Sequence, residues 1–184
     1  MNNRMNKVTV LNGCLSFFLI LFSSTLFAAT RANSVAFTLG GGYEYFSSKH
    51  EVKNTGVGFG ALGYNFTDHW GIEGLVGFFN TKSQRVATYH EQVKGTLFAI
   101  DGLYHFSSFQ VVEPYLLAGV GVMGMNPSGD DAHNEGNINA GVGVQWFANQ
   151  VVALRVEARD FYTWVGGKND VMLDAGVMFL LDLC

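Results

Sequence analysis

The chain has 184 residues, of which 48% are hydrophobic, 14% are aromatic and only 14% are charged, and 23 are glycines. This composition excludes a disordered chain, which would carry fewer aromatic residues and more charge. The net charge of −4 and the absence of a basic run argue against nucleic-acid binding, whereas high apolarity with low charge indicates a membrane or β-rich protein of single-domain length.

The first predicted element is an export signal. Arg4 and Lys7 precede the apolar run Leu15–Phe27, and small alanines follow between positions 28 and 32. This order is typical of a secretory signal peptide, and the apolar run is too short for a comfortable transmembrane helix. We expect residues 1–29 to be the signal peptide, with cleavage between positions 28 and 32, and residues 30–184 to form one domain.

Beyond the leader, apolar residues alternate with small or polar ones. In Asn137–Phe147, for example, Ile138 and Val142 share one face, while Asn139 and Gln145 share the other. A period of two predicts a β-strand. The same pattern predicts eight strands, each about long enough to cross a bilayer when tilted: Ser34–Phe46, Thr55–Phe66, Trp70–Asn80, Val93–Phe106, Glu113–Met125, Asn137–Phe147, Val152–Trp164 and Val171–Leu181.

The connections between these strands alternate in length. Those at 67–69, 107–112 and 148–151 are short, whereas those at 47–54, 81–92 and 126–136 are longer and polar, and the last, at 165–170, is intermediate. Short periplasmic turns that alternate with longer external loops are the signature of an outer-membrane barrel. We therefore predict an all-β fold, an eight-stranded antiparallel up-and-down transmembrane β-barrel with both termini on the periplasmic side.

The predicted outer faces suit lipid. Phe37 and Leu39 of the first strand, Phe98 and Ile100 of the fourth, and the apolar residues of the eighth would all face outward. Aromatic residues near the strand ends would form the interfacial girdle of such a barrel. They are Tyr45, Phe66, Trp70, Phe106, Phe147, Tyr162 and Trp164.

Charged residues on the opposite faces predict a polar lumen. Arg155, Glu157 and Arg159 share one face of the seventh strand, while Leu154 and Val156 share the other. Charges face hydrocarbon only at high cost, so we assign the charged face to the interior. The predicted inner faces of other strands add Glu44 and Asp174. The candidate site is an ion-pair network in the lumen, made of Glu73, Asp101, Gln145, Arg155, Glu157 and Arg159.

Four segments resemble the small eight-stranded OmpA-like outer-membrane barrels. They are Tyr64–Glu73, Glu113–Gly121, Gly143–Phe147 and Leu154–Arg159, and their order and spacing carry the resemblance, which covers the barrel domain only. It implies that the lumen network acts as a plug or gate. Glu73, Gln145, Arg155 and Glu157 match the family's network, whereas Asp101 replaces a residue that is often basic, and Gln145 one that is often acidic.

These patterns leave three functions open. We expect a structural and surface role with at most a small gated pore. The alternative is a surface adhesin or interaction protein that acts through its external loops. A barrel enzyme that modifies lipid A is a third reading, because His105-Phe-Ser107 is similar to the His-x-Ser pairing of such enzymes, but here the pair falls at a periplasmic strand end.

The expected setting follows from the barrel. Residues 30–184 keep one cysteine, Cys184, which excludes an internal disulfide and a thiolate metal site. We expect no enzymatic activity, no catalytic residue, no cofactor and no metal. The expected partners are outer-membrane lipids and lipopolysaccharide, with a host or cell-surface ligand at the loops, and no nucleic acid. The protein should be a monomer in the outer membrane of the cell.

Overall fold

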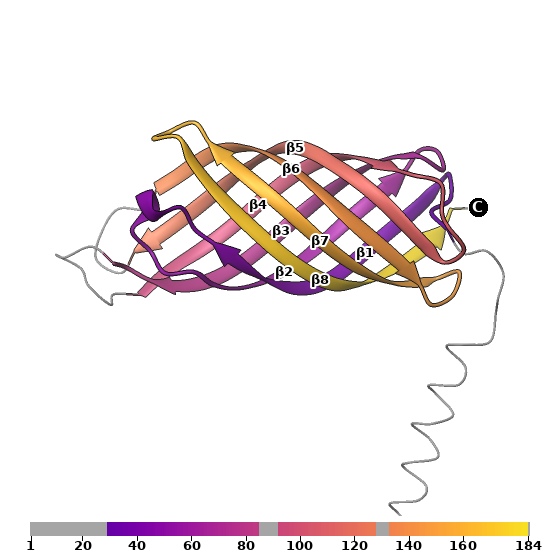
Figure 1. The fold of residues 1–184 in the computed structure, drawn as a ribbon, viewed down its shortest axis with the longest axis horizontal. Helices are drawn as coiled ribbons and strands as arrows, with labels where there is room; N and C mark the ends of the chain where they lie inside the picture. Colours follow the sequence, from indigo (N-terminus) through magenta and orange to yellow (C-terminus); the bar gives the residue numbers. More distant parts are fainter. Residues whose placement is uncertain (1–28, 85–91, 128–132, 184) are drawn as a thin grey trace, which may run out of the picture.

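The protein is a closed barrel of eight antiparallel strands, as the computed structural model shows (Figure 1). The structure describes residues 29–84, 92–127 and 133–183, so the expected leader up to residue 28 and Cys184 lie outside the described residues. The strands are β1 (Ser34–Tyr45), β2 (Thr55–Asn65), β3 (Trp70–Lys82), β4 (Gln92–His105), β5 (Val112–Pro127), β6 (His133–Phe147), β7 (Val152–Thr163) and β8 (Lys168–Asp182).

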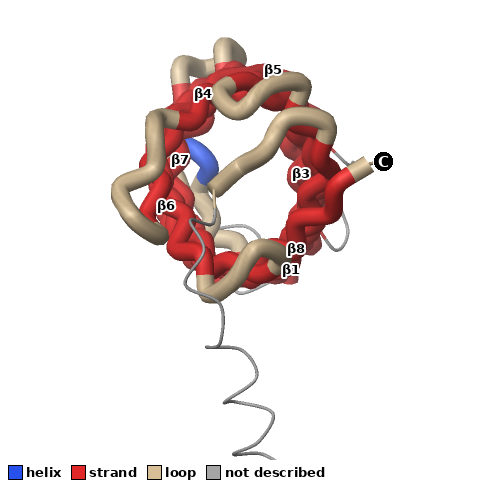
Figure 2. Tube along the Cα trace, turned by 90° about the vertical axis from the view of Figure 1, so that its right-hand side faces the viewer, coloured by secondary structure: helices blue, strands red, loops and turns tan. Residues whose placement is uncertain are grey.

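Each strand pairs with the next, and β1 pairs with β8 to close the ring (Figure 2). At this seam Ser34 lies opposite Asp182, and Tyr45 lies opposite Val171. Closure leaves no open sheet edge. A sheet in hydrocarbon must close in this way, because unpaired backbone amides are costly there. The predicted fold class is therefore confirmed. No helix in the described part of the chain is long and apolar enough to cross a membrane.

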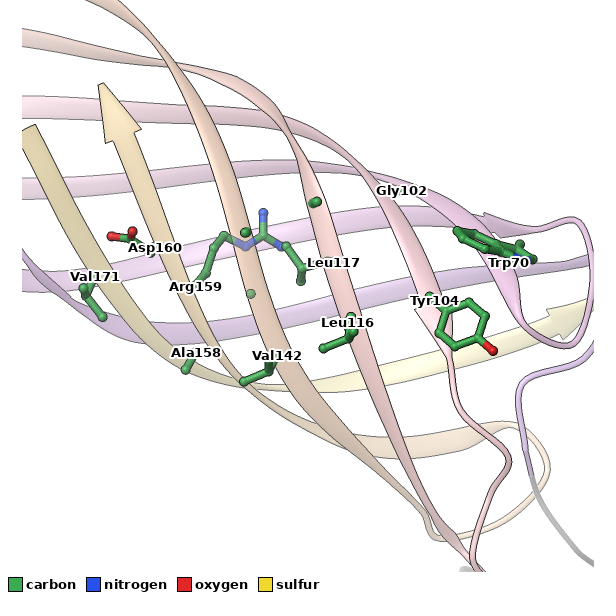
Figure 3. Close-up of a pocket in the computed structure, with 13 residues that line it drawn as sticks. Trp70, Gly102, Tyr104, Leu116, Leu117, Val142, Ala158, Arg159, Asp160 and Val171 are labelled. Atoms are coloured by element: carbon green, nitrogen blue, oxygen red, sulfur yellow. The ribbon is translucent and has the colours of Figure 1, made fainter. Parts of the chain in front are cut away.

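The two faces of the wall follow the predicted alternation. In Figure 3, Ala158 and Arg159 lie on opposite faces of β7, and only Arg159 is fully buried. Between its two ends the outer face is mainly apolar, and it includes a hollow lined by Trp70, Gly102 and Ala118 among others. Six of the seven girdle residues are exposed on the outer face, as expected: Tyr45, Phe66, Trp70, Phe106, Tyr162 and Trp164.

The prediction that Phe147 belongs to the interfacial girdle is wrong. Phe147 is 2% exposed and packs inside the barrel against Met178 and Leu180. The physical reason is its parity: Phe147 lies two residues after the inward Gln145 on the same strand, and residues i and i+2 of a strand share a face. Its aromatic ring therefore fills the lumen instead of facing the membrane interface.

The strands also run further than the alternation of apolar residues indicates. The ladder between β3 and β4 continues to Lys82 opposite Gln92, and that between β5 and β6 continues to Met125 opposite His133. The loops predicted at 81–92 and 126–136 are therefore shorter than expected. The ladder extends past the apolar stretch because backbone hydrogen bonds between strands do not require apolar side chains.

The barrel has two distinct ends. The turn end carries the three short turns, residues 29–33 and the end of β8, while the loop end carries the other four connections. At the loop end, the β1–β2 connection, which contains a short 3-10 helix, η1 (Ser48–His50), lies within the outline of the ring (Figure 2). Its Phe46 and Val52 join an apolar cluster that fills this half of the lumen together with Phe59, Phe79, Leu97, Met123, Phe161 and others.

Candidate functional site

An arginine bridges the lumen between opposite walls. Arg155 on β7 donates to both carboxylate oxygens of Glu73 on β3, with 2.8 Å between Nη2 and Oε1. Three strands lie between β3 and β7 in either direction around the eight-stranded ring, so the two residues start from opposite sides. The two-pronged geometry is the strong form of an arginine–carboxylate bond, and here it spans the lumen from β7 to β3.

A second arginine extends the cluster toward the loop end. The Nη1 atom of Arg159 lies 2.6 Å from Oδ2 of Asp101 on β4, and its Nε lies 2.8 Å from Oε1 of Glu157. Its Nη2 also approaches Oε1 of Glu73 at 3.7 Å. The guanidinium lies 5.7 Å from the ring centre of Phe161, where the apolar cluster begins. Arg159 thus contacts both the ion-pair cluster and the apolar cluster on its loop-end side.

Tyr115 on β5 completes the cluster. Its hydroxyl donates to Oε2 of Glu157 over 2.6 Å, and Cζ of Arg155 lies 5.0 Å from its ring centre. The ring has space because it lies against Gly143 of β6, where a Cβ atom would come within 2.2 Å of Tyr115 Cζ. The glycine is thus required by a close approach of a large side chain.

The cluster holds two guanidinium groups against three carboxylates. Its five charged members are each at most 3% exposed. Burying charges is costly unless they are paired and hydrogen-bonded, and here each charged group has an opposite charge in contact. Three atoms, Arg155 Nε, Arg159 Nη2 and Asp101 Oδ1, have no hydrogen-bond partner among the described residues. A hollow of about 10 Å³ beside Arg155 and Glu73 is close to the space one water needs.

The structure brings together five of the six residues in the predicted network. Gln145 is buried in the lumen but lies toward the turn end, where its Oε1 is 3.5 Å from the hydroxyl of Thr30. Glu44 and Asp174 also point inward, as the alternation predicts. Neither carboxylate oxygen of Glu44 has a hydrogen-bond partner among the described residues, so Glu44 lies in the lumen outside the ion-pair cluster.

A second polar cluster, at the turn end, did not emerge from the sequence. His105 Nδ1 lies 3.0 Å from Oε1 of Glu113, and Thr30 donates to the same carboxylate. Glu113 and Tyr115 share the inner face of β5, so the alternation that located Arg155 could have located both. Thr30 carried no such signal, because it lies at the margin of the expected leader.

The His105–Ser107 pair is not assembled as a nucleophile and base. The Nδ1 atom of His105 faces Glu113 within the barrel, whereas Ser107 is exposed in the turn that follows β4. Within the ranges that the structure describes, no group of three His, Cys, Asp or Glu side chains is placed to hold a metal ion.

Comparisons with known proteins agree with this architecture. The family model for the outer membrane protein beta-barrel domain matches residues 16–178. No curated protein sequence matches significantly. The N-terminal β-barrel domain of Pseudomonas aeruginosa OprF is 23% identical, with a TM-score of 0.58, and the match covers 82% of this chain and 98% of that one.

Two further solved structures share the fold. Outer membrane protein OprG from Pseudomonas aeruginosa is 10% identical with a TM-score of 0.63, and 84% of this chain and 99% of that chain are covered. Ail, the attachment invasion locus protein of Yersinia pestis, in complex with the heparin analogue sucrose octasulfate, is 12% identical with a TM-score of 0.60, and the coverages are 82% and 99%.

In outer-membrane barrels short turns face the periplasm and longer loops face the outside. The turn end of this barrel is accordingly periplasmic and the loop end extracellular. The closed ring, the apolar outer wall, the charged lumen and the family match together show that the chain belongs to the outer membrane β-barrel domain family and resides in the outer membrane.

Proposed function

We propose that the protein is a closed, non-conducting structural and surface barrel, without enzymatic activity. The observation that carries this proposal is the ion pair between Arg155 and Glu73, which spans the lumen from β7 to β3. Side chains fill the interior of an eight-stranded barrel, and here the filling at mid-height is charged, with each charged group of the cluster in contact with an opposite charge. In this proposal the cluster is the plug that the resemblance to OmpA-like barrels implies.

The parts of the lumen on either side of the ion-pair cluster support the same function. The apolar cluster fills the extracellular half, and the β1–β2 connection adds Phe46 and Val52 to it. The periplasmic half of the lumen holds the packed side chains of Phe147 and Leu180 and the buried pair of His105 and Glu113. An ion that entered from outside would therefore meet an apolar layer before it reached the charged layer.

A conductance measurement tests the closed lumen. Protein purified from outer membranes and shown to be folded by its heat-modifiable migration on gels is inserted into a planar bilayer. We expect no discrete current steps above those of a protein-free bilayer. Steps in the wild-type protein would contradict the proposal. Steps that change in Arg155→Ala but not in the lipid-facing control Val156→Leu would place the conducting path through the cluster.

A specific observation favours an interaction role at the loop end as a second function. All described lysines lie there, and two of them are already engaged: Lys168 pairs with Glu135, and Lys49 donates to the carbonyls of Gly166 and Gly167. The remaining three are exposed on the extracellular rim: Lys53, Lys82 and Lys94. Because the structurally similar Ail was solved with a heparin analogue, we propose that this rim binds sulfated glycans.

Retention on immobilised heparin tests the lysine rim. The triple variant Lys53→Gln, Lys82→Gln, Lys94→Gln should elute at lower salt than the wild type, because fewer charges face the sulfates and salt screens exposed charges. Lys168→Gln is the matched control at the same end, since Glu135 already pairs with that lysine. Equal elution of the wild type and the triple variant would exclude these lysines as the binding surface.

A further inference from the structure

The short segment before β1 is built into the barrel. Thr30 is 4% exposed, and its backbone N–H donates to Oε2 of Glu113 over 3.0 Å. Its hydroxyl donates to the other oxygen of the same carboxylate and lies 3.5 Å from Nδ1 of His105. Thr30 therefore closes the periplasmic end of the lumen over a buried acid.

The next residues tie this segment to three other places on the rim. Nε of Arg31 lies 2.7 Å from Oδ1 of Asp182 at the end of β8, and its Nη1 donates to the carbonyl of Gln150 in the β6–β7 turn. The backbone N–H of Ala32 donates to Oδ1 of Asp68 in the β2–β3 turn over 2.8 Å. These contacts, with that of Thr30 to β5, hold the segment across the mouth.

Glu113 makes the segment necessary. Its carboxylate is 2% exposed, and its partners among the described residues are His105 and the two donors of Thr30. Removing Thr30 would leave this buried acid with the imidazole alone, and a buried carboxylate that loses its donors is destabilising. The barrel is thus built for a chain that still contains Thr30.

We propose that export processing removes the leader on the amino side of Thr30, and that the retained segment 30–32 forms the periplasmic closure of the mature barrel. The sequence allows cleavage anywhere from position 28 to position 32, and only cleavage after Ala28 or Ala29 keeps Thr30. Hydrolysis there adds one water across the peptide bond and leaves a carboxylate on the leader and an amino group on the barrel. That new amino group, protonated near neutral pH, brings positive charge toward Glu113.

Mass spectrometry of the protein purified from outer membranes tests the proposal directly. The first residue should be Ala29 or Thr30. A chain that begins at Arg31 or later would lack the closing residue and would overturn the proposal. A chain that still carries residues 1–28 would overturn it as well, because no processing would have occurred.

A second measurement tests whether the segment stabilises the barrel. Two refolded proteins, one beginning at Thr30 and one at Asn33, are unfolded in urea under identical conditions. We expect the shorter protein to unfold at a lower urea concentration, and we expect Glu113→Gln to recover part of this shift in the shorter protein only. Equal midpoints for the two chains would show that the contacts of Thr30 and Arg31 do not close the barrel.

Discussion

Arg155 and Glu73 form a two-pronged ion pair between strands that face each other across the barrel. The pair joins positions 82 residues apart in the chain. It therefore ties together two walls that share no backbone hydrogen bond. In the function that we propose, the same pair blocks the lumen at mid-height, so stability and closure would depend on the same side chains.

Arg155→Ala should destabilise the barrel strongly. The variant leaves Glu73 and Glu157 buried, with Arg159 as the remaining cation, and breaking a buried pair typically costs about 3–5 kcal/mol. Water that enters the vacated space should reduce this cost, while Arg155→Glu should be worse. Urea unfolding in detergent micelles measures the change. Val156→Leu, on the lipid face of the same strand, should leave the midpoint within error of the wild type.

Tyr115→Phe should cost less, because it removes a single hydrogen bond. The hydroxyl donates to the carboxylate of Glu157, and a hydrogen bond to a charged group contributes about 1.5–3 kcal/mol. The same unfolding measurement applies. Tyr104→Phe makes the identical chemical change in the hollow on the outer face of the barrel. If both variants lost equal stability, the bond to Glu157 would contribute nothing specific.

Gly143→Ala should displace Tyr115 and so weaken the cluster indirectly. An added Cβ would lie 2.2 Å from Tyr115 Cζ, which forces the ring to move away from Glu157. Overpacking of this kind typically costs about 1–3 kcal/mol. At Gly58 on the outer face an added Cβ would meet nothing within 4 Å, so Gly58→Ala is the control. Equal unfolding midpoints for the two variants would mean that the ring of Tyr115 moves aside without a loss of stability.

His50→Ala should loosen the extracellular closure while the barrel stays folded. His50 Nε2 lies 2.9 Å from Oδ2 of Asp170, and both side chains are buried where the β1–β2 connection meets β8. Without this contact, protease should cut the connection faster. Heat-modifiable migration should not change, because the strand ladders are untouched. An unchanged cleavage rate would show that Phe46 and Val52 hold the connection without His50.

Much of the fold could be predicted because one physical rule acts on every strand. Lipid excludes charge, so the alternation that exposes Val156 to the membrane places Arg155 inside. The same rule should have placed Phe147 inside with Gln145, but the position of this aromatic residue near a strand end outweighed its parity. Along β6, parity therefore decides the face of this side chain, and residue type does not.

The pairing within the lumen could not be predicted in the same way. Alternation tells which side chains point inward, but the partner of Arg155 depends on the register of four ladders between β3 and β7. The sequence therefore placed Gln145 in the network, whereas the structure puts it beside Thr30. The place of Thr30 itself depends on tertiary contacts that no local pattern reports.

A double-mutant cycle on Arg155 and Glu73 measures directly whether the two residues interact across the lumen. The unfolding free energies of the wild type, Arg155→Ala, Glu73→Gln and the double variant are measured in the same micelles. We expect the double variant to lose less stability than the sum of the single losses, by about 1–3 kcal/mol, because residues in contact couple. Losses that add within experimental error would contradict the ion pair across the lumen and the plug built on it.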